Sequence, residues 1–163
     1  MTADELILHL GLEPHPVEGG YFRETLRSPL PVATAGGPRS VGTAIYYLLT
    51  GTAVSEMHRL PGDEVFHFYL GDTPDMLRLH PDGTVTTPAL GTALAAGEVP
   101  QLVVPGGVWQ GSVRRAGPHG FTLVGATMAP GFDYADYVTD SRALRRGRPS
   151  GSWGSSKLSA SAG

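Results

Sequence analysis

Short apolar runs separated by glycine and proline are the feature that most restricts how this sequence can fold. The chain has 163 residues, of which 23 are glycine and 14 are proline. Glycine tolerates a positive φ and proline holds φ at a fixed negative value, so both residues favour turns. Short runs rich in Val, Ile, Tyr and Phe between such turns are typical of an all-β sandwich or barrel. We therefore expect an all-β fold.

The expected elements follow these breaks along the chain. Thr2 and Glu5 form a capping-box pattern, which predicts a short helix that ends at Gly11. A loop is expected over residues 29–38 and a second short helix over residues 140–146. The predicted strands cover residues 21–27, 40–49, 54–60, 64–70, 76–80, 85–87, 98–104, 109–113 and 121–128.

Composition narrows the class of protein. The chain carries 12 Lys and Arg against 15 Asp and Glu, a net charge of −3, and it has no cysteine. A basic stripe, which binding to nucleic acid or to an anionic membrane surface requires, is absent from the sequence. The start of the chain lacks the pattern of a signal peptide, so we expect a cytoplasmic protein with no nucleic-acid or membrane partner. We expect one domain over residues 1–147 and a flexible Gly/Ser-rich tail over residues 148–163.

The segment from His58 to Gly71 contains several closely spaced titratable side chains. Its sequence predicts two strands joined at Pro61-Gly62-Asp63 into a hairpin, with His58 ending one strand and Glu64 beginning the other. Titratable side chains directed into an otherwise apolar barrel are typical of a binding or catalytic pocket.

Six blocks in order over residues 6–140 resemble one branch of the cupin superfamily, the domain-of-unknown-function 985 (cupin type 5) family. The blocks span residues 12–16, 18–25, 43–49, 58–71, 105–110 and 123–132. The resemblance implies a double-stranded β-helix, or jelly-roll barrel, with short flanking helices. It also implies a homodimer and a small-molecule ligand, but no settled activity.

The cupin signatures imply a divalent transition metal, and this sequence departs from them. His58 and Glu64 match two of four expected ligands, whereas Leu60 and Trp109 occupy the other two positions. A metal site at His58 and Glu64 therefore needs a third ligand such as His67 or Gln110. Strand alternation places His67 on the opposite face from Glu64.

Acid–base chemistry is the main functional hypothesis. His58 is the expected base, and Glu64 is expected to orient it, in an isomerase, epimerase or cyclase acting on a small polar or anionic substrate. The incomplete metal set resembles metal-free sugar-nucleotide epimerases of the cupin fold. The arginines are expected to clamp an anionic group and the aromatics to supply an acid or a stacking wall. The expected substrate-binding residues are Arg23, Tyr47, Arg59, His67, Tyr69, Trp109 and Gln110.

Two other functions are also compatible with the sequence. One is a metal-dependent dioxygenase or decarboxylase that uses His58, Glu64 and a third ligand. The other is a non-catalytic barrel that holds a sugar or nucleotide between Trp109 and the tyrosines. Metal content separates the metal-dependent alternative from the others, and loss of turnover in His58→Ala is expected where His58 is the base.

Overall fold

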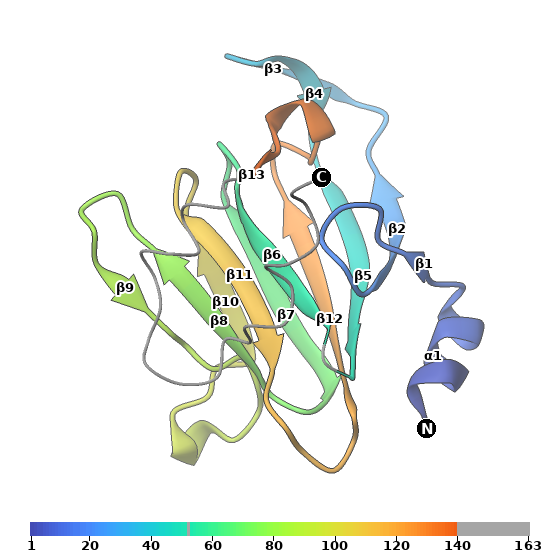
Figure 1. The fold of residues 1–163 in the computed structure, drawn as a ribbon. Helices are drawn as coiled ribbons and strands as arrows, with labels where there is room; N and C mark the ends of the chain where they lie inside the picture. The colour runs from blue at the N-terminus through green and yellow to red at the C-terminus, as the bar shows by residue number, and fades with distance from the viewer. Residues whose placement is uncertain (52, 140–163) are drawn as a thin grey trace, which may run out of the picture.

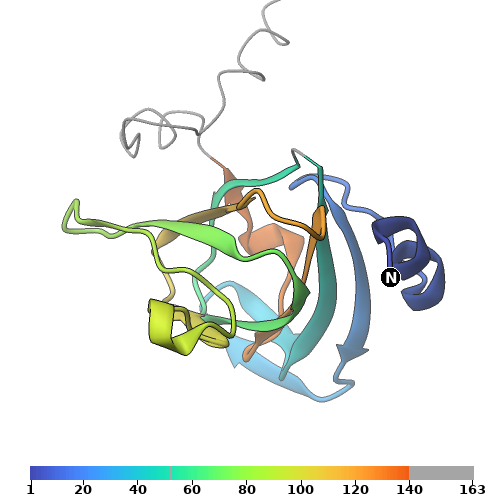
Figure 2. The ribbon, with the colours of Figure 1, turned by 90° about the horizontal axis from the view of Figure 1, so that it is seen from below.

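Two antiparallel sheets face each other and close into a barrel (Figure 1, Figure 2). The computed structural model describes residues 1–51 and 53–139. The larger sheet has the strand order β1-β2-β5-β12-β7-β10. Its strands are β1 (Glu13–Pro14), β2 (Tyr21–Arg27), β5 (Thr43–Thr50), β12 (Phe121–Met128), β7 (Glu64–Gly71) and β10 (Gln101–Val104).

The facing sheet is smaller and has the order β13-β6-β11-β8-β9. Its strands are β13 (Val138–Thr139), β6 (Val54–Arg59), β11 (Trp109–Arg114), β8 (Pro74–Leu79) and β9 (Val85–Thr86). Two 3₁₀ turns, η1 (Leu94–Ala96) and η2 (Tyr134–Asp136), lie in the connections. The prediction of an all-β barrel is confirmed.

One helix, α1 (Ala3–Leu10), packs on the outer face of the larger sheet (Figure 2). Its capping box is present, with the Thr2 side chain accepting from the backbone of Glu5, and Gly11 ends the helix in the left-handed region. The apolar side of the helix covers Leu48, Phe121 and Leu123. Over residues 1–51 and 53–139, no helix has the length and apolar character needed to cross a membrane.

The segment after β2 corrects the sequence analysis. Residues 29–38 were expected to form a loop, but β3 (Pro31–Thr34) and β4 (Gly37–Ser40) pair as a two-stranded hairpin. Gly37 adopts a φ of 103°, and the Thr34 hydroxyl donates to the Gly37 carbonyl. A two-stranded hairpin tolerates its prolines because each strand has one edge that needs no ladder bond. The predicted helix over 140–146 and the tail over 148–163 lie outside the described residues.

The hairpin expected between β6 and β7 is also wrong in its pairing. Both strands exist, but β6 pairs with β11 and β13, whereas β7 pairs with β10 and β12. The turn at Pro61-Gly62-Asp63 therefore carries the chain from one sheet to the other. This turn is hydrogen-bonded to the turn that follows β10. The Gly106 amide donates to the Asp63 carboxylate, and the Gly107 amide donates to the Leu60 carbonyl oxygen. This crossing places His58 and Glu64 on facing walls.

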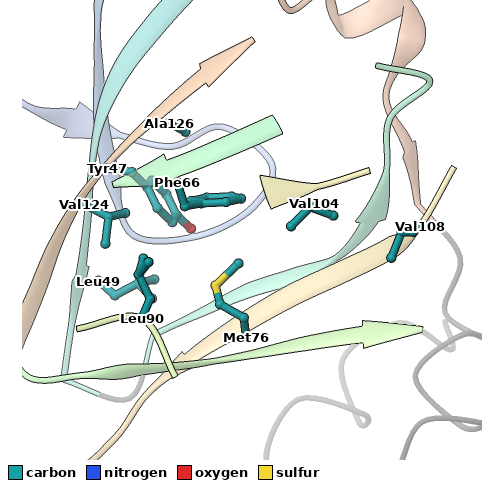
Figure 3. Close-up of a cluster of buried hydrophobic side chains, with 9 residues drawn as sticks. All are labelled: Tyr47, Leu49, Phe66, Met76, Leu90, Val104, Val108, Val124 and Ala126. Atoms are coloured by element: carbon teal, nitrogen blue, oxygen red, sulfur yellow. The ribbon is translucent and has the colours of Figure 1, made fainter. Parts of the chain in front are cut away.

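The main core fills the space between the sheets (Figure 3). Alternate residues of β5, β7 and β12 point inward, as the period of two in a strand requires. Tyr47, Phe66 and Ala126 belong to this core and also form the floor of the cavity described below.

Candidate functional site

A cavity of about 300 Å³ opens at the end of the barrel where β7 begins and β12 ends. This volume is at the lower limit of typical small-molecule pockets. Most of its wall is apolar, and the charged side chains are few. The lining residues are His15, Glu18, Phe22, Glu24, Arg27, Thr43, Ile45, Tyr47, Leu60, Glu64, Phe66, Ala126, Met128, Phe132 and Tyr134.

The loop between β1 and β2 brings His15 and Glu18 into this wall. Gly19 and Gly20, both with positive φ, let the loop lie directly on the barrel. A Cβ at Gly20 would sit 2.6 Å from the Leu48 carbonyl oxygen, so only glycine fits there without a shift. The Glu18 carboxylate then accepts a 3.0 Å hydrogen bond from the Ser55 hydroxyl of the opposite sheet.

His15 is held as a neutral ring. Its Nδ1 accepts hydrogen bonds from the backbone amides of Val17 and Glu18, at 3.3 and 2.9 Å. The ring packs edge-on against Phe22 and Tyr47. Burial lowers the pKa of His15, and because Nδ1 accepts, the ring proton resides on Nε2.

Glu64 is the group in the cavity lining whose pKa is brought close to neutral pH. The residue is 8% exposed, and its Oε2 accepts a 2.6 Å hydrogen bond from the Gln110 side-chain amide. Burial raises the pKa of Glu64 to about 7, although the charge of His58 and the bond from Gln110 act in the opposite direction. A carboxyl group in this state gives and takes a proton near neutral pH.

His58 lies beside this group but is 2% exposed and is not part of the cavity lining. Its Nδ1 lies 2.8 Å from the Glu56 carbonyl oxygen, which can only accept, so Nδ1 carries a proton. Its Nε2 is 3.9 Å from Glu18 Oε1. That separation is too long for a hydrogen bond, but it allows Coulombic attraction when the ring is protonated.

Tyr137 packs on the ring of His58. The two rings stack with centroids 5.0 Å apart and planes 22° apart. The segment carrying Tyr137 is anchored by Asp136, whose two carboxylate oxygens each accept a 2.7 Å bond from Arg39 of β4. Burial raises the pKa of the Tyr137 hydroxyl far above its usual value, so the group stays protonated.

Two buried polar atoms of the residues that contact His58 and Glu64 have no hydrogen-bond partner among the described residues. They are the Tyr137 hydroxyl and Oε1 of Gln110. Gln110 is the cross-strand neighbour of His58 on β11. Unpaired buried polar atoms are costly and are concentrated where a ligand or water completes the structure.

The structure brings four of the residues predicted from the sequence together. Tyr47 and Glu64 line the cavity, while His58 and Gln110 lie directly behind its wall. The Tyr47 hydroxyl is not free, because it donates to the Gly19 carbonyl oxygen at 2.9 Å. Burial raises its pKa well above the usual range.

The other five predicted substrate-binding residues do not line the cavity. The Arg23 guanidinium is exposed and lies over the Tyr46 ring, and Tyr69 packs edge-on against the same ring. His67 contacts Thr127 and Gln101 on the outer face of the larger sheet, as strand alternation predicted. Arg59 is stacked on Trp109 on the smaller sheet. These side chains point outward because each shares the outward register of its strand.

Sequence reasoning missed His15, Glu18 and Tyr137 as parts of the site. His15 and Glu18 belong to the motifs that carry the family resemblance, and Glu18 precedes a Gly-Gly pair. The Gly-Gly pair was the available signal. Two adjacent glycines are typical of a loop whose backbone packs closely against another segment, and such a loop brings its neighbouring side chains to that segment.

Comparison with known proteins identifies the family. Residues 4–139 match the family described as "Cupin superfamily (DUF985)". The chain is a member of this family. It is 35% identical over 136 residues to an uncharacterized protein of Saccharomyces cerevisiae, an alignment that covers 74% of this chain and 67% of the yeast protein.

Solved structures give the same result for the cupin fold. A hypothetical protein from Leishmania major superimposes with a TM-score of 0.82 at 34% identity, covering 88% of this chain and 89% of that one. A protein from Shewanella oneidensis gives 0.80 at 39% identity, covering 89% and 88%. A Bacillus subtilis oxalate decarboxylase variant gives 0.55 at 13% identity over 78% of this chain and 30% of its own. The last likeness shows the fold alone.

The donor set does not fit the metal that the cupin fold implies. Within the described part of the chain, no group of three or more His, Cys, Asp or Glu side chains is arranged to hold a metal ion. Leu60 of the cavity wall and Trp109 stand at two of the signature's ligand positions. Gln110 turns its amide NH₂ toward Glu64, so a donor faces the carboxylate that would bind the cation. Transition-metal sites normally require three or four ligating groups.

Proposed function

We propose that this protein is an enzyme that moves a proton within a small organic molecule held in the barrel cavity. Glu64 is the group that takes the proton and returns it. The observation that carries the proposal is a carboxyl group in the cavity wall with a pKa of about 7. Near neutral pH such a group is present in both protonation states, which general acid–base catalysis requires.

The reaction class follows from one group serving both directions. The Glu64 carboxylate removes a proton from a carbon next to a carbonyl, and the resulting acid returns it to the same molecule. The electron pair of the C–H bond passes into an enolate, and protonation of a second atom on the same face isomerises the substrate, so all its atoms are retained and no co-reactant is consumed.

His58 and Gln110 act through Glu64 in this proposal. The charge of His58 and the hydrogen bond from Gln110 both lower the pKa of the Glu64 carboxyl, against the larger effect of burial. These roles are the reverse of those expected from the sequence, in which His58 is the base and Glu64 orients it. The reversal rests on access, because Glu64 lines the cavity, whereas His58 is buried and does not line it.

Deuterium uptake tests the proposal without a known substrate. The protein is incubated in D₂O with a pool of small carbonyl compounds, and mass spectrometry reads the deuterium gained at carbon. The wild-type chain is expected to label at least one compound, and Glu64→Gln is expected to lose this activity by at least about a hundredfold. Glu13→Gln, an exposed carboxylate outside the cavity, serves as the matched control and should keep full activity.

Two results would contradict the proposal. One is equal labelling by the wild-type chain and Glu64→Gln. The other is no labelling of any compound, which would favour the non-catalytic binding barrel among the alternatives. The homodimer and the cytoplasmic location expected from the sequence stay predictions.

A further inference from the structure

The charges that line the cavity are strongly unequal. They comprise the carboxyl groups of Glu18, Glu24 and Glu64 and one guanidinium, that of Arg27. His15 contributes no positive charge, because burial lowers its pKa and its Nδ1 accepts backbone hydrogen bonds. The cavity is therefore acidic, which disfavours the anionic class among the small polar or anionic substrates expected from the sequence.

The single guanidinium is already occupied. Arg27 donates from Nε and Nη2 to both carboxylate oxygens of Glu24, at 3.0 and 2.7 Å. Its Nη1 donates to the Phe132 carbonyl oxygen at 3.0 Å. This pairing leaves Arg27 without a free bidentate edge for a ligand carboxylate or phosphate. The arginines predicted to clamp an anion, Arg23 and Arg59, are stacked on aromatic rings outside the cavity.

The charged groups that remain for a ligand are carboxylates, while the donors of the lining are neutral groups such as His15 Nε2 and the Tyr134 hydroxyl. Glu24 is paired with Arg27, so Glu18 and Glu64 carry the remaining negative charge of the lining, with His58 behind the wall as the neighbouring titratable base. The Tyr47 hydroxyl gives its proton to Gly19 and presents only lone pairs to other groups. Oε1 of Gln110, which is 2% exposed and next to Glu64, is a further acceptor with no donor among the described residues.

We propose that the cavity takes a molecule with an apolar or aromatic body and a hydrogen-bond-donating head, foremost an ammonium group. The head contacts Glu18, and the body packs against the apolar wall and leaves Glu64 free for the proton transfer. That wall includes Phe22, Ile45, Phe66, Met128 and Phe132. The inference rests on the proposed function, because it concerns the substrate class of the same cavity. A buried or partly buried carboxylate attracts a cation more strongly than an exposed one, because water screens it less.

Three probes of nearly equal size separate head-group charge from shape. They are phenethylamine, 2-phenylethanol and phenylacetate, which carry a cationic, a neutral and an anionic head on the same ring. Titration at pH 8, followed by amide chemical shifts in NMR, gives the three dissociation constants. The amine is expected to bind about tenfold more tightly than the alcohol and about a hundredfold more tightly than the carboxylate.

Charge removal inside the cavity is the decisive comparison. Glu18→Gln is expected to reduce the amine-to-alcohol preference about fivefold to tenfold, with the dissociation constant of the alcohol unchanged. Asp4→Asn makes the same charge change in the exposed first turn of α1 and should leave the preference unchanged. A preference for phenylacetate, equal effects of the two substitutions, or no binding of any probe would overturn the inference.

The inference and the proposed function fail separately. Selective amine binding that disappears in Glu18→Gln, together with no deuterium uptake, would retain the ligand class and remove the catalytic role of Glu64. Deuterium uptake lost in Glu64→Gln, together with tightest binding of phenylacetate, would retain the proton transfer and remove the ligand class.

Discussion

Two buried carboxylates lie at the two ends of strand β7 and behave in opposite ways. Glu64 is the first residue of the strand, and Asp72 directly follows its last residue. Both side chains are almost completely withdrawn from solvent, with the residues 8% and 5% exposed. Burial raises the pKa of Glu64 to about 7, whereas the pKa of Asp72 is lowered. Burial therefore does not determine the state of either group by itself.

The difference is in the donors that each carboxylate receives. Burial pushes the pKa of Asp72 upward, but the backbone amides of His119 and Gly120 and the guanidinium of Arg114 together outweigh it. The three bonds measure 3.0, 2.8 and 2.6 Å. Glu64 receives one bond, from Gln110. A buried carboxylate that accepts several hydrogen bonds stays ionised and stabilises the fold. A buried carboxylate that accepts only one titrates near neutral pH.

Removing the charge of Asp72 is expected to have the largest effect. Asp72→Asn leaves Arg114, whose side chain is 13% exposed, without its counter-charge and should cost about 3 kcal/mol of unfolding free energy at pH 7. Because the pKa of Asp72 is lowered in the folded state, the stabilisation is present above the unfolded value and is lost in acid. Chemical denaturation at pH 7 and pH 3 should show the deficit shrinking at the lower pH.

The exposed ion pair on the next strand provides the control. Asp75 and Arg115 have side chains that are 33% and 50% exposed, so Asp75→Asn should cost less than about 1 kcal/mol. Equal losses from Asp72→Asn and Asp75→Asn would remove the distinction between the two kinds of carboxylate.

In contrast to Asp72→Asn, Glu64→Gln is expected to stabilise the folded protein above about pH 7. The raised pKa means that the unfolded chain ionises Glu64 above about pH 4.5, while the folded chain keeps the proton until about pH 7. The wild-type chain therefore loses stability as pH rises through this window, by about 3 kcal/mol when complete. The variant lacks this loss, so it should be more stable than wild type at pH 8 and equally stable at pH 4. Urea unfolding at the two pH values measures the difference, and a less stable variant at pH 8 would contradict the assigned ionisation.

The smallest expected effect concerns the one donor that Glu64 has. Gln110→Leu removes the 2.6 Å bond to the carboxylate, so the pKa of Glu64 should rise further, by about one pH unit. The titration of the Glu64 carboxyl carbon, followed by ¹³C NMR in wild type and variant, reads this directly. An unchanged midpoint would mean that Gln110 does not support the ionised form.

Much of the fold could be predicted from local sequence. The capping box of Thr2 and Glu5, the breaks at glycine and proline, and the period of two along β7 indicated the helix, most strands and the inward position of Phe66. The hairpin of residues 31–40 was missed because its prolines argue against strands. Proline prevents only those hydrogen bonds that a strand would need to donate, and an outer edge needs none.

Only part of the candidate site could be predicted from the sequence. His58 and Glu64 were found because a short motif contains both. Arg23 and Arg59 were expected in the pocket because arginine suits anions, but the register of each strand turns the side chain outward. A one-residue change of register reverses the face of every side chain, and the sequence of a strand does not state its register at a bulge.

The sequence by itself determined the all-β class, the family and the presence of a titratable pair near the turn at Pro61. These follow from local conformational preferences and from motifs that are contiguous along the chain. Only the tertiary structure decided that Glu64 faces the cavity, that Tyr137 packs on His58, and that Glu18 joins them. The ionisation of Glu64 depends on how much water and how many donors surround its carboxyl group. Those surroundings come from strands and loops that are distant in sequence, so no local pattern encodes them.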